Sequence, residues 1–552
     1  MKRIKKVMLL LVQLIALEEC VTFMAAHYFF EIEPSSVSLT FALSFLVLVM
    51  LNWHTKRYKT KDFFKLTHLL LMVVLLFWVV LFRAGFVWAL NTFPLRDANT
   101  VLLTLQEPFD DFAYGMVKMS LATIIPQTLV ITAILTVFLY TILNSTRKRL
   151  VAVGAYFVAT IVALFSDIPV LNYIQLLKGD STKNDAYSEF FIENYADPDS
   201  VKITPPDQKR NLILIYLESL ETTFADKEHG GNQDFNLIPE ITELALENLN
   251  FGRNGKHIGG GHDIRGSAST FSAMISRSLG IPDIVNYKNT LVLHRYKSLY
   301  KILDECGYKQ IFFQGNPGLY EEFKDYVIEQ KVDEVYGPDD IAQRLNLDHD
   351  AFMKKQGFKN VQDKDAFRFA GQILDTISEP FSLTFFTIDT HSPHGFYDSD
   401  CIKVVDENNK DELLKASIQC VSRELNKFIV SLKSKPFYEN TAIVIFGDHL
   451  FMGKRLVESD ADRKWVDVFL NTPKPISGEK RLFSDVDMFP TILSSMNFDV
   501  VGNKLGLGTN LFSDRKTLVE RMGLDSLNKE INKMPNHLIY ESYLLKMGQK
   551  GM

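Results

Sequence analysis

The stretch TAIVIFGDH, residues 441–449, decides the fold, because a mostly apolar run ends abruptly at an acidic residue and a histidine. A short apolar run rich in β-branched residues predicts a buried strand. Asp448 and His449 then stand side by side at its end, and carboxylates and imidazoles are residue types that bind divalent metal ions. We therefore interpret this stretch as a strand whose carboxyl end carries a metal-binding corner.

Other apolar runs of the chain also stop at polar residues: LILIYL (212–217) at Glu218, IFF (311–313) at Gln314-Gly315-Asn316, and LTFFTI (383–388) at Asp389-Thr390-His391. Helical patterns lie between and beyond these runs, at 237–248, 297–306, 364–377 and 412–433. Alternating strands and helices predict an α/β fold with a mainly parallel sheet flanked by helices. The carboxyl ends of parallel strands form the ligand crevice of such a sheet. Residues scattered from 218 to 449 are therefore predicted to converge on one site.

The first third of the chain is far more apolar than the rest. It predicts five transmembrane helices, each close to the roughly 20 residues that cross a bilayer, at 7–30, 36–53, 66–90, 119–143 and 150–174. Basic residues precede the first helix and lie between the second and third and between the fourth and fifth, which places the N-terminus in the cytoplasm. We expect a membrane domain (1–174), a membrane-surface connector (175–210), an external catalytic domain (211–515) and a C-terminal tail (516–552).

Charge and cysteine content restrict the partners and the compartment. The 552 residues include 60 basic and 66 acidic side chains, a net charge of −6, so no basic field predicts nucleic-acid binding. Cys401 and Cys420 both fall in the domain expected outside the membrane, where thiols are oxidised. We predict that they form a disulfide, although their spacing does not by itself fix the pairing.

A candidate nucleophile lies in GSASTFSAMIS, residues 266–276, where a glycine-rich segment leads into a helical pattern. Ser269 or Thr270 would stand at the helix N-terminus, which favours phosphate. A hydroxyl there, next to a metal ion, can be deprotonated and attack phosphorus. The ordinary alternative is a plain Ser/Thr N-cap. Together with Glu218 and the Asp448-His449 pair, however, the hydroxyl completes the parts for metal-assisted phosphoryl or sulfuryl transfer.

Several of these motifs resemble the sulfatase-like phosphoglycerol transferases, which include the lipoteichoic acid synthases and the transferases that modify periplasmic glucans. The motifs are LESLE (217–221), STFSA (269–273), LGIP (279–282), DTH (389–391), FY (396–397), DH (448–449), DMFPT (487–491) and LGLG (505–508). The resemblance runs from about residue 210 to 512 and extends to the five-helix anchor. It implies an alkaline phosphatase/sulfatase-like fold, with the catalytic domain on the periplasmic or extracellular side of a bacterial inner membrane.

The resemblance also implies roles for individual residues. Glu218, Thr270, Asp448 and His449 match the metal-binding set, and Thr270 also matches the nucleophile. His391 matches a histidine that contacts the substrate phosphate or the leaving group, and His394 is expected to assist it.

The predicted headgroup site departs from the family pattern. Gly315-Asn316 begins like the family's glycerol-phosphate segment, but the Trp-x-Arg that follows there is absent. Tyr320 and Lys324 are the nearest substitutes, so Asn316, Tyr320 and Lys324 are the expected substrate-binding residues and the headgroup stays open.

The expected function is metal-dependent transfer of phosphoglycerol from phosphatidylglycerol to a periplasmic glycan through a threonine-linked intermediate. Manganese is the metal that the resemblance implies, with zinc or magnesium as alternatives, because this ligand set does not select sharply. One alternative is a phosphoethanolamine transferase acting on lipid A or a glycan, but such relatives usually carry several disulfides. The others are a sulfatase or phosphodiesterase, and a non-catalytic membrane sensor or transporter, against which the intact nucleophile and metal set argue.

Overall fold

The computed structural model describes residues 124–125, 128–132, 189–283, 296–347, 361–392, 394–403, 406, 408–452, 456–457, 462–476 and 478–531. The five predicted transmembrane helices lie outside these residues, except that 124–125 and 128–132 are helical within the predicted span 119–143. Among the described residues, no helix is both long enough and apolar enough to cross a membrane. The chain divides into two units, Met1–Lys183 and Asn184–Met552.

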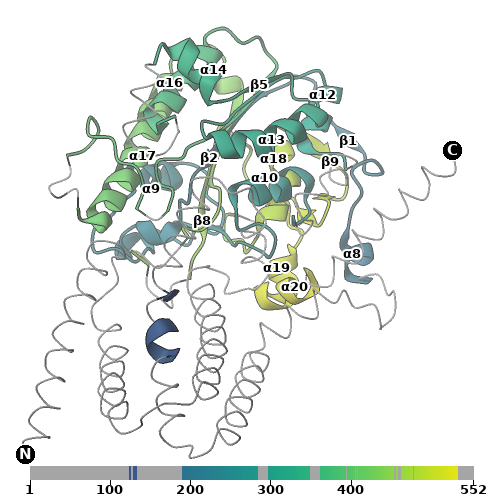
Figure 1. The fold of residues 1–552 in the computed structure, drawn as a ribbon. Coiled ribbons are helices and arrows are strands. Elements are labelled where there is room, and N and C mark those ends of the chain that lie inside the picture. Colours follow the sequence, from purple (N-terminus) through teal and green to yellow (C-terminus); the bar gives the residue numbers. More distant parts are fainter. Residues whose placement is uncertain are drawn as a thin grey trace, which may run out of the picture. The chain divides into compact units, whose positions relative to one another are not determined.

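A seven-stranded sheet forms the centre of the second unit (Figure 1), and its strand order is β3-β8-β7-β2-β6-β4-β5. Its strands are β2 (Asn211–Leu217), β3 (Gly260–Gly261), β4 (Lys309–Phe313), β5 (Glu334–Tyr336), β6 (Phe381–Phe386), β7 (Thr441–Gly447) and β8 (Trp465–Leu470). The neighbours from β7 to β5 are parallel, whereas β8 runs antiparallel to β7 and β3 antiparallel to β8. The predicted α/β fold is confirmed, with a mixed sheet whose parallel part contains the strands named from the sequence.

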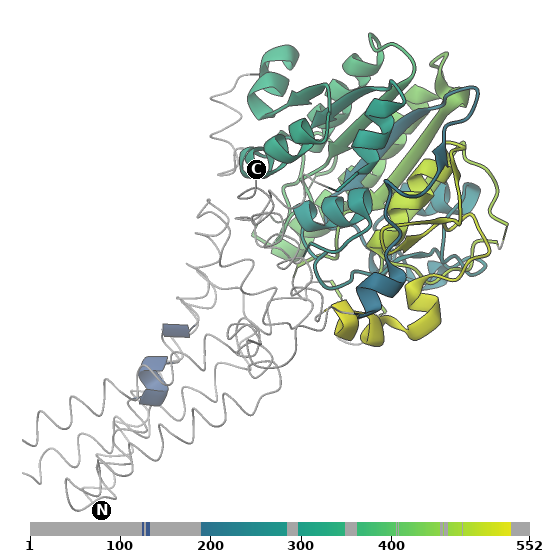
Figure 2. The same cartoon turned by 90° about the vertical axis from the view of Figure 1, so that its right-hand side faces the viewer.

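Helices cover both faces of this sheet (Figure 1, Figure 2). One face packs against α9 (Pro239–Glu247), α14 (Pro338–Leu345), α16 (Asp363–Leu374) and α17 (Lys410–Leu432). The other packs against α10 (Thr270–Leu279), α12 (Leu299–Glu305), α13 (Pro317–Glu329) and α18 (Met488–Ser495). Successive side chains of a strand point to opposite faces, and β2 follows this rule: Leu212 and Leu214 belong to one core cluster, Ile213 and Ile215 to the other. The four helices expected from the sequence are confirmed to within a few residues.

The described segment that precedes β2 packs against the same unit as the sheet. Helix α8 (Glu189–Asn194) buries Phe191 in the core, and β1 (Ile203–Thr204) pairs antiparallel with β9 (Asp499–Val500). The described part of the expected connector therefore packs on the catalytic unit. The expected tail does so too, through α19 (Leu518–Met522) and α20 (Leu524–Ile531). The remaining short elements are β10 (Lys504–Leu505), β11 (Gly508–Thr509), η2 (Thr222–Phe224), η3 (Lys227–His229), η5 (Tyr438–Asn440) and η6 (Asp485–Asp487).

Strand register brings the polar strand ends together. Tyr216 of β2 is paired with Phe386 of β6 on one side and with Phe446 of β7 on the other. The three strands therefore end at the same level, and the residues that follow each of them emerge at one edge of the sheet. This edge holds Glu218 after β2 and Asp448 after β7.

Candidate active site

Three side chains that could hold a metal ion meet at this edge of the sheet. One ligand atom each from Glu218, Asp448 and His449 lies within 4.8 Å of the others, and all three residues are buried. His449 Nε2 is 3.6 Å from Glu218 Oε1 and 3.6 Å from Asp448 Oδ2. The structure thus brings together the three non-hydroxyl members of the predicted metal set.

Backbone and hydroxyl donors fix the two carboxylates. Ser219 lies in the left-handed region (φ 54°), which is uncommon for a residue with a side chain. Its N–H donates to Asp448 Oδ1 (2.7 Å), and its hydroxyl donates to Glu218 Oε1 (2.6 Å). The His449 N–H also donates to Asp448 Oδ1 (2.7 Å). Asp448 Oδ2 is buried without a hydrogen-bond partner in the described part of the chain, which leaves it available as a ligand atom.

The His449 ring is held with one nitrogen turned to the cluster. Nδ1 lies 2.9 Å from the Leu450 carbonyl oxygen, so Nδ1 carries the proton and donates it there. In the neutral ring Nε2 then keeps its lone pair, which is the form of imidazole that binds a metal. Asp263 supports the same turn, because its Oδ2 accepts a hydrogen bond from the Leu450 N–H (3.2 Å).

The hydroxyl of Thr270 completes the cluster. Ser269 is the N-cap of α10, its side chain accepting from the Ser272 N–H, and Thr270 is the first helical residue. Thr270 Oγ1 lies 3.5 Å from Glu218 Oε2 and 3.5 Å from His449 Nε2. Of the two hydroxyls that the sequence left open, Ser269 caps the helix and Thr270 faces the acidic and imidazole groups.

The electrostatics of the cluster favour an added positive charge. Burial, and then the neighbouring Asp448 carboxylate, raise the pKa of Glu218 to about 8. For His449, burial lowers the pKa, but the Asp448 and Glu218 carboxylates and the hydrogen bond to Leu450 raise it, and the net effect is a raised pKa. The ligand oxygens of Glu218 and Asp448 lie within 4.8 Å of each other, and two buried carboxylates this close are stabilised by a cation between them. Asp448 Oδ2 is unpartnered and available to a metal ion. The observed 3.6 Å from His449 Nε2 to each carboxylate is close to the ~3.4 Å expected between the ligand atoms of a tetrahedral divalent metal ion.

Two threonine side chains that follow β6 form hydrogen bonds with the backbone of Glu218. The Glu218 N–H donates to Thr387 Oγ1 (2.9 Å), and the Thr390 hydroxyl donates to the Glu218 carbonyl oxygen. The second contact holds Thr390, the residue before His391, against the backbone of Glu218. The Nδ1 atom of His391 lies 2.9 Å from the Ser392 carbonyl oxygen.

The remaining predicted substrate residues have structural contacts of their own. Asn316 is the N-cap of α13, with its Oδ1 accepting from the Leu319 N–H (2.9 Å). Lys324 Nζ lies 5.4 Å from the centre of the Tyr320 ring, one turn away on the same helix. The His394 ring centre is 6.4 Å from that of Phe396. The substrate-binding role of these residues stays a prediction.

Some supporting residues escaped the sequence-based reasoning. Thr387 stands two residues before the DTH motif and Thr390 is its central residue, so their position at a candidate strand end was a usable signal. Asp263 and Arg277 lie just outside residues 266–276, one on each side, and no local sequence pattern marks either of them as a supporting residue. Nothing in the sequence marks Ser219 as left-handed.

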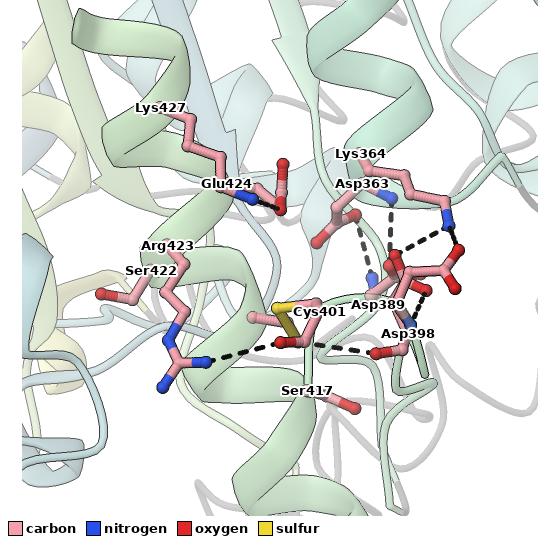
Figure 3. Close-up of a disulfide and its surroundings, with 12 residues drawn as sticks. Asp363, Lys364, Asp389, Asp398, Cys401, Ser417, Ser422, Arg423, Glu424 and Lys427 are labelled. Carbon is pink, nitrogen blue, oxygen red and sulfur yellow. Dashed lines mark hydrogen bonds and ion pairs between the residues drawn. A yellow bond between two sulfur atoms is a disulfide. The ribbon is translucent and has the colours of Figure 1, made fainter. Parts of the chain in front are cut away.

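The predicted disulfide is confirmed: Cys401 is bonded to Cys420, with their Cα atoms 5.9 Å apart (Figure 3). Cys420 belongs to α17, and Cys401 lies in the loop that follows His391. The bridge therefore ties the loop that follows the β6 strand end to a helix of the scaffold.

A buried carboxylate pair lies near the disulfide (Figure 3). Asp363 Oδ1 accepts from the Ile388 N–H (2.7 Å) and from the Asp389 N–H (3.1 Å), while Asp389 Oδ2 accepts from the Asp363 N–H (3.0 Å). Burial raises the pKa of Asp363 to about 7. The pair fixes the start of α16 to the segment that leads to His391.

Comparisons with known proteins identify the family of the chain. The Sulfatase family matches residues 210–498, more than half of the chain. Phosphoglycerol transferase I of Escherichia coli (strain 55989 / EAEC) is 27% identical over 351 residues, which are 61% of this chain and 43% of that protein. The chain thus aligns with less than half the length of these curated relatives.

Among solved structures, the lipoteichoic acid synthase LtaP from Listeria monocytogenes shares 13% identity at a TM-score of 0.47, covering 65% of this chain and 98% of that one. The lipooligosaccharide phosphoethanolamine transferase A (EptA) from Neisseria meningitidis shares 13% identity at a TM-score of 0.43, covering 89% and 95%. The chain belongs to the sulfatase family.

Proposed function

We propose that this protein is a metal-dependent transferase that moves phosphoglycerol from phosphatidylglycerol to a glycan acceptor, through an intermediate in which phosphoglycerol is bonded to Thr270. One observation carries the proposal: the Thr270 hydroxyl stands at the N-terminus of α10, 3.5 Å from both Glu218 and His449. A helix N-terminus favours a phosphate, and the donor class follows from the name of the curated relatives, phosphoglycerol transferase I.

Each residue has a defined part in the proposed reaction. Thr270 Oγ1 passes its proton to water and bonds to the phosphorus of the lipid headgroup, and the bond from phosphorus to the diacylglycerol oxygen breaks. His391 donates a proton to that leaving oxygen. An acceptor hydroxyl then attacks the same phosphorus, and its proton passes to His391. The bond from phosphorus to Thr270 breaks, and the Thr270 oxygen takes a proton back from water. Splitting the transfer in two keeps phosphoglycerol on the protein between donor and acceptor.

Glu218, Asp448, His449 and Thr270 are the residues that would hold the metal. A divalent ion there lowers the pKa of a hydroxyl and offsets charge on phosphoryl oxygens. Manganese is the proposed ion, and zinc and magnesium are the alternatives, because carboxylate, hydroxyl and imidazole ligands accept all three. We place the protein in the bacterial inner membrane with this site on the outer side, where the lipid donor and the oxidised cysteine pair would both be found.

The deciding experiment measures diacylglycerol release from vesicles. Purified full-length protein is incubated with manganese and vesicles that contain either phosphatidylglycerol or phosphatidylethanolamine as the only headgroup that can react. Diacylglycerol from phosphatidylglycerol alone supports the proposal. Diacylglycerol from phosphatidylethanolamine alone replaces it with a phosphoethanolamine transferase, and none from either rejects both donors.

A second measurement separates transfer from hydrolysis. With phosphatidylglycerol labelled in its headgroup, a transferase leaves label on the protein before acceptor is added, whereas a phosphodiesterase releases it to water. Mass spectrometry of the peptide that contains Thr270 would locate the label. Release of free glycerol phosphate without any labelled protein would favour the hydrolase alternative.

A further inference from the structure

A fully buried arginine joins the helix of Thr270 to the metal corner. Arg277 lies in the last turn of α10 and is 0% exposed. Its Nη1 donates to the Gly447 carbonyl oxygen (2.8 Å), and its Nη2 donates to the Asp448 carbonyl oxygen (2.8 Å). Its Nε donates to Asp485 Oδ1 (2.9 Å). One side chain thus holds the carboxyl end of β7 against α10.

Aromatic rings surround the guanidinium on its remaining sides. Its central carbon lies 4.2 Å from the Trp465 ring centre, 4.6 Å from that of Phe446 and 5.8 Å from that of Tyr216. Such contacts offset part of the cost of burying the charge. A buried ion pair is nevertheless often no more stable than apolar side chains of the same size. Stability alone therefore does not account for this arginine.

Asp485 extends the connection to the other side of Thr270. The Ser267 hydroxyl donates to Asp485 Oδ2 (2.6 Å), while Arg277 binds Oδ1 of the same carboxylate. Ser267 precedes Thr270 in the chain, and Arg277 follows it two helical turns later. The segment that carries the hydroxyl is therefore anchored to one carboxylate both before and after Thr270.

We propose that Arg277 and Asp485 are positioning residues that set the distance between the Thr270 hydroxyl and the Asp448-His449 corner. The inference rests on the proposed function, because it takes Thr270 as the nucleophile and the corner as a metal site. Arginine suits the task because its planar fork reaches two carbonyls and a carboxylate at once, which a lysine ammonium on a flexible stem does not reproduce.

The test compares Arg277→Lys with Arg481→Lys. Arg481 is a matched control, because it is also buried, pairs with Glu520 and donates to the carbonyl oxygens of Leu511 and Ser513, but anchors the C-terminal helices instead of the site. Residues that orient metal ligands typically contribute about 10- to 100-fold to metal affinity or activity. We expect Arg277→Lys to lose about 10- to 100-fold in manganese affinity or in kcat, with little change in KM for the lipid. Arg481→Lys should keep the manganese affinity and the kcat of the wild-type protein.

Manganese affinity is measured by calorimetry without lipid, so this arm does not depend on which phospholipid reacts. Equal manganese affinity and equal kcat in the two variants would overturn the proposal, as would a wild-type protein that binds no divalent ion. If wild type binds manganese but turns over no phospholipid, the donor assignment fails while the affinity comparison still decides the role of Arg277.

Circular dichroism and Tm establish that each variant folds. If Arg277→Lys does not fold, Ser267→Ala takes its place, because it removes a single hydroxyl, which donates to Asp485 and also accepts from the Ile264 N–H. A several-fold fall in kcat with unchanged Tm supports the positioning role, and an unchanged kcat rejects it.

Discussion

Thr270 Oγ1 and His449 Nε2 lie 3.5 Å apart, although one begins a helix and the other follows a strand far along the chain. The hydroxyl also lies 3.5 Å from Glu218 Oε2. A hydroxyl held between an imidazole nitrogen and a carboxylate is placed to lose its proton and act as a nucleophile. The neighbouring Ser269 hydroxyl is occupied as a helix cap.

Replacing Thr270 with Ala is therefore expected to lower diacylglycerol release by about 10³-fold or more, as removal of a covalent nucleophile does. Thr270→Ser keeps the hydroxyl and should retain measurable turnover. Ser269→Ala is the matched control: it removes the cap at a cost of about 1 kcal/mol in stability and should leave labelled protein detectable. Full activity in Thr270→Ala together with loss in Ser269→Ala would exchange the two roles.

Asp448→Asn should abolish tight metal binding while keeping the local fold. The Asn Oδ1 atom can still accept from the N–H groups of Ser219 and His449, but the charged Oδ2 ligand atom is lost. Metal that binds only the folded protein raises Tm, so manganese should raise the Tm of the wild-type protein and not that of the variant.

Asp487→Asn serves as the control for this change, because Asp487 is buried too but accepts from the N–H groups of Ser484 and Thr509. Its manganese-dependent rise in Tm should equal that of wild type. A manganese response retained in Asp448→Asn would argue against the three-residue metal set.

The Asp363–Asp389 pair predicts a pH-dependent stability. Burial raises the pKa of Asp363 to about 7, and burial followed by the Asp363 charge raises that of Asp389 well above its usual range. A raised carboxyl pKa means that the folded protein holds the proton more tightly than the unfolded chain does. The contribution is complete below about pH 4 and is lost as the pH rises through about 7.

Asp363→Asn should remove much of this dependence, because the amide keeps the acceptor for Ile388 and Asp389 and never ionises. We expect the variant to be more stable than wild type at pH 8 by about 1 kcal/mol or more, with the difference closing toward pH 4. Urea unfolding at several pH values measures it. Parallel pH profiles for the two proteins would show that Asp363 does not ionise in this range.

Removing the disulfide should affect turnover more than metal binding. Cys401→Ser with Cys420→Ser releases the loop after His391 from α17 but leaves the residues of the metal cluster in place. In the chain-entropy view, a bridge across a loop of this length stabilises by about 3 kcal/mol. We expect a lower Tm and lower kcat, with manganese affinity kept within a few-fold. A reductant should have the same effect on wild type and none on the double variant.

The sequence indicated the ends of β2 and β7 reliably, because each strand is a continuous apolar run and the carboxyl ends of parallel strands lie at the same edge of the sheet. β2 and β7 were located to within a residue, which placed Glu218, Asp448 and His449 together. What it could not show depends on contacts between distant segments. The left-handed Ser219 and the buried Arg277 take their meaning from neighbours that no local pattern reveals. β1 and β9 have two residues each, too short for any periodic signal.

The β1–β9 pair has a consequence for how this protein is made. Ile203 pairs with Val500, so a nascent chain cannot complete that contact until nearly all of the catalytic unit has left the ribosome. The segment between the expected membrane helices and the sheet is therefore among the last to be secured. A recombinant catalytic fragment begun at residue 211 would lack both β1 and the buried Phe191, and would expose apolar surface where aggregation begins. A fragment begun before Glu189 keeps them.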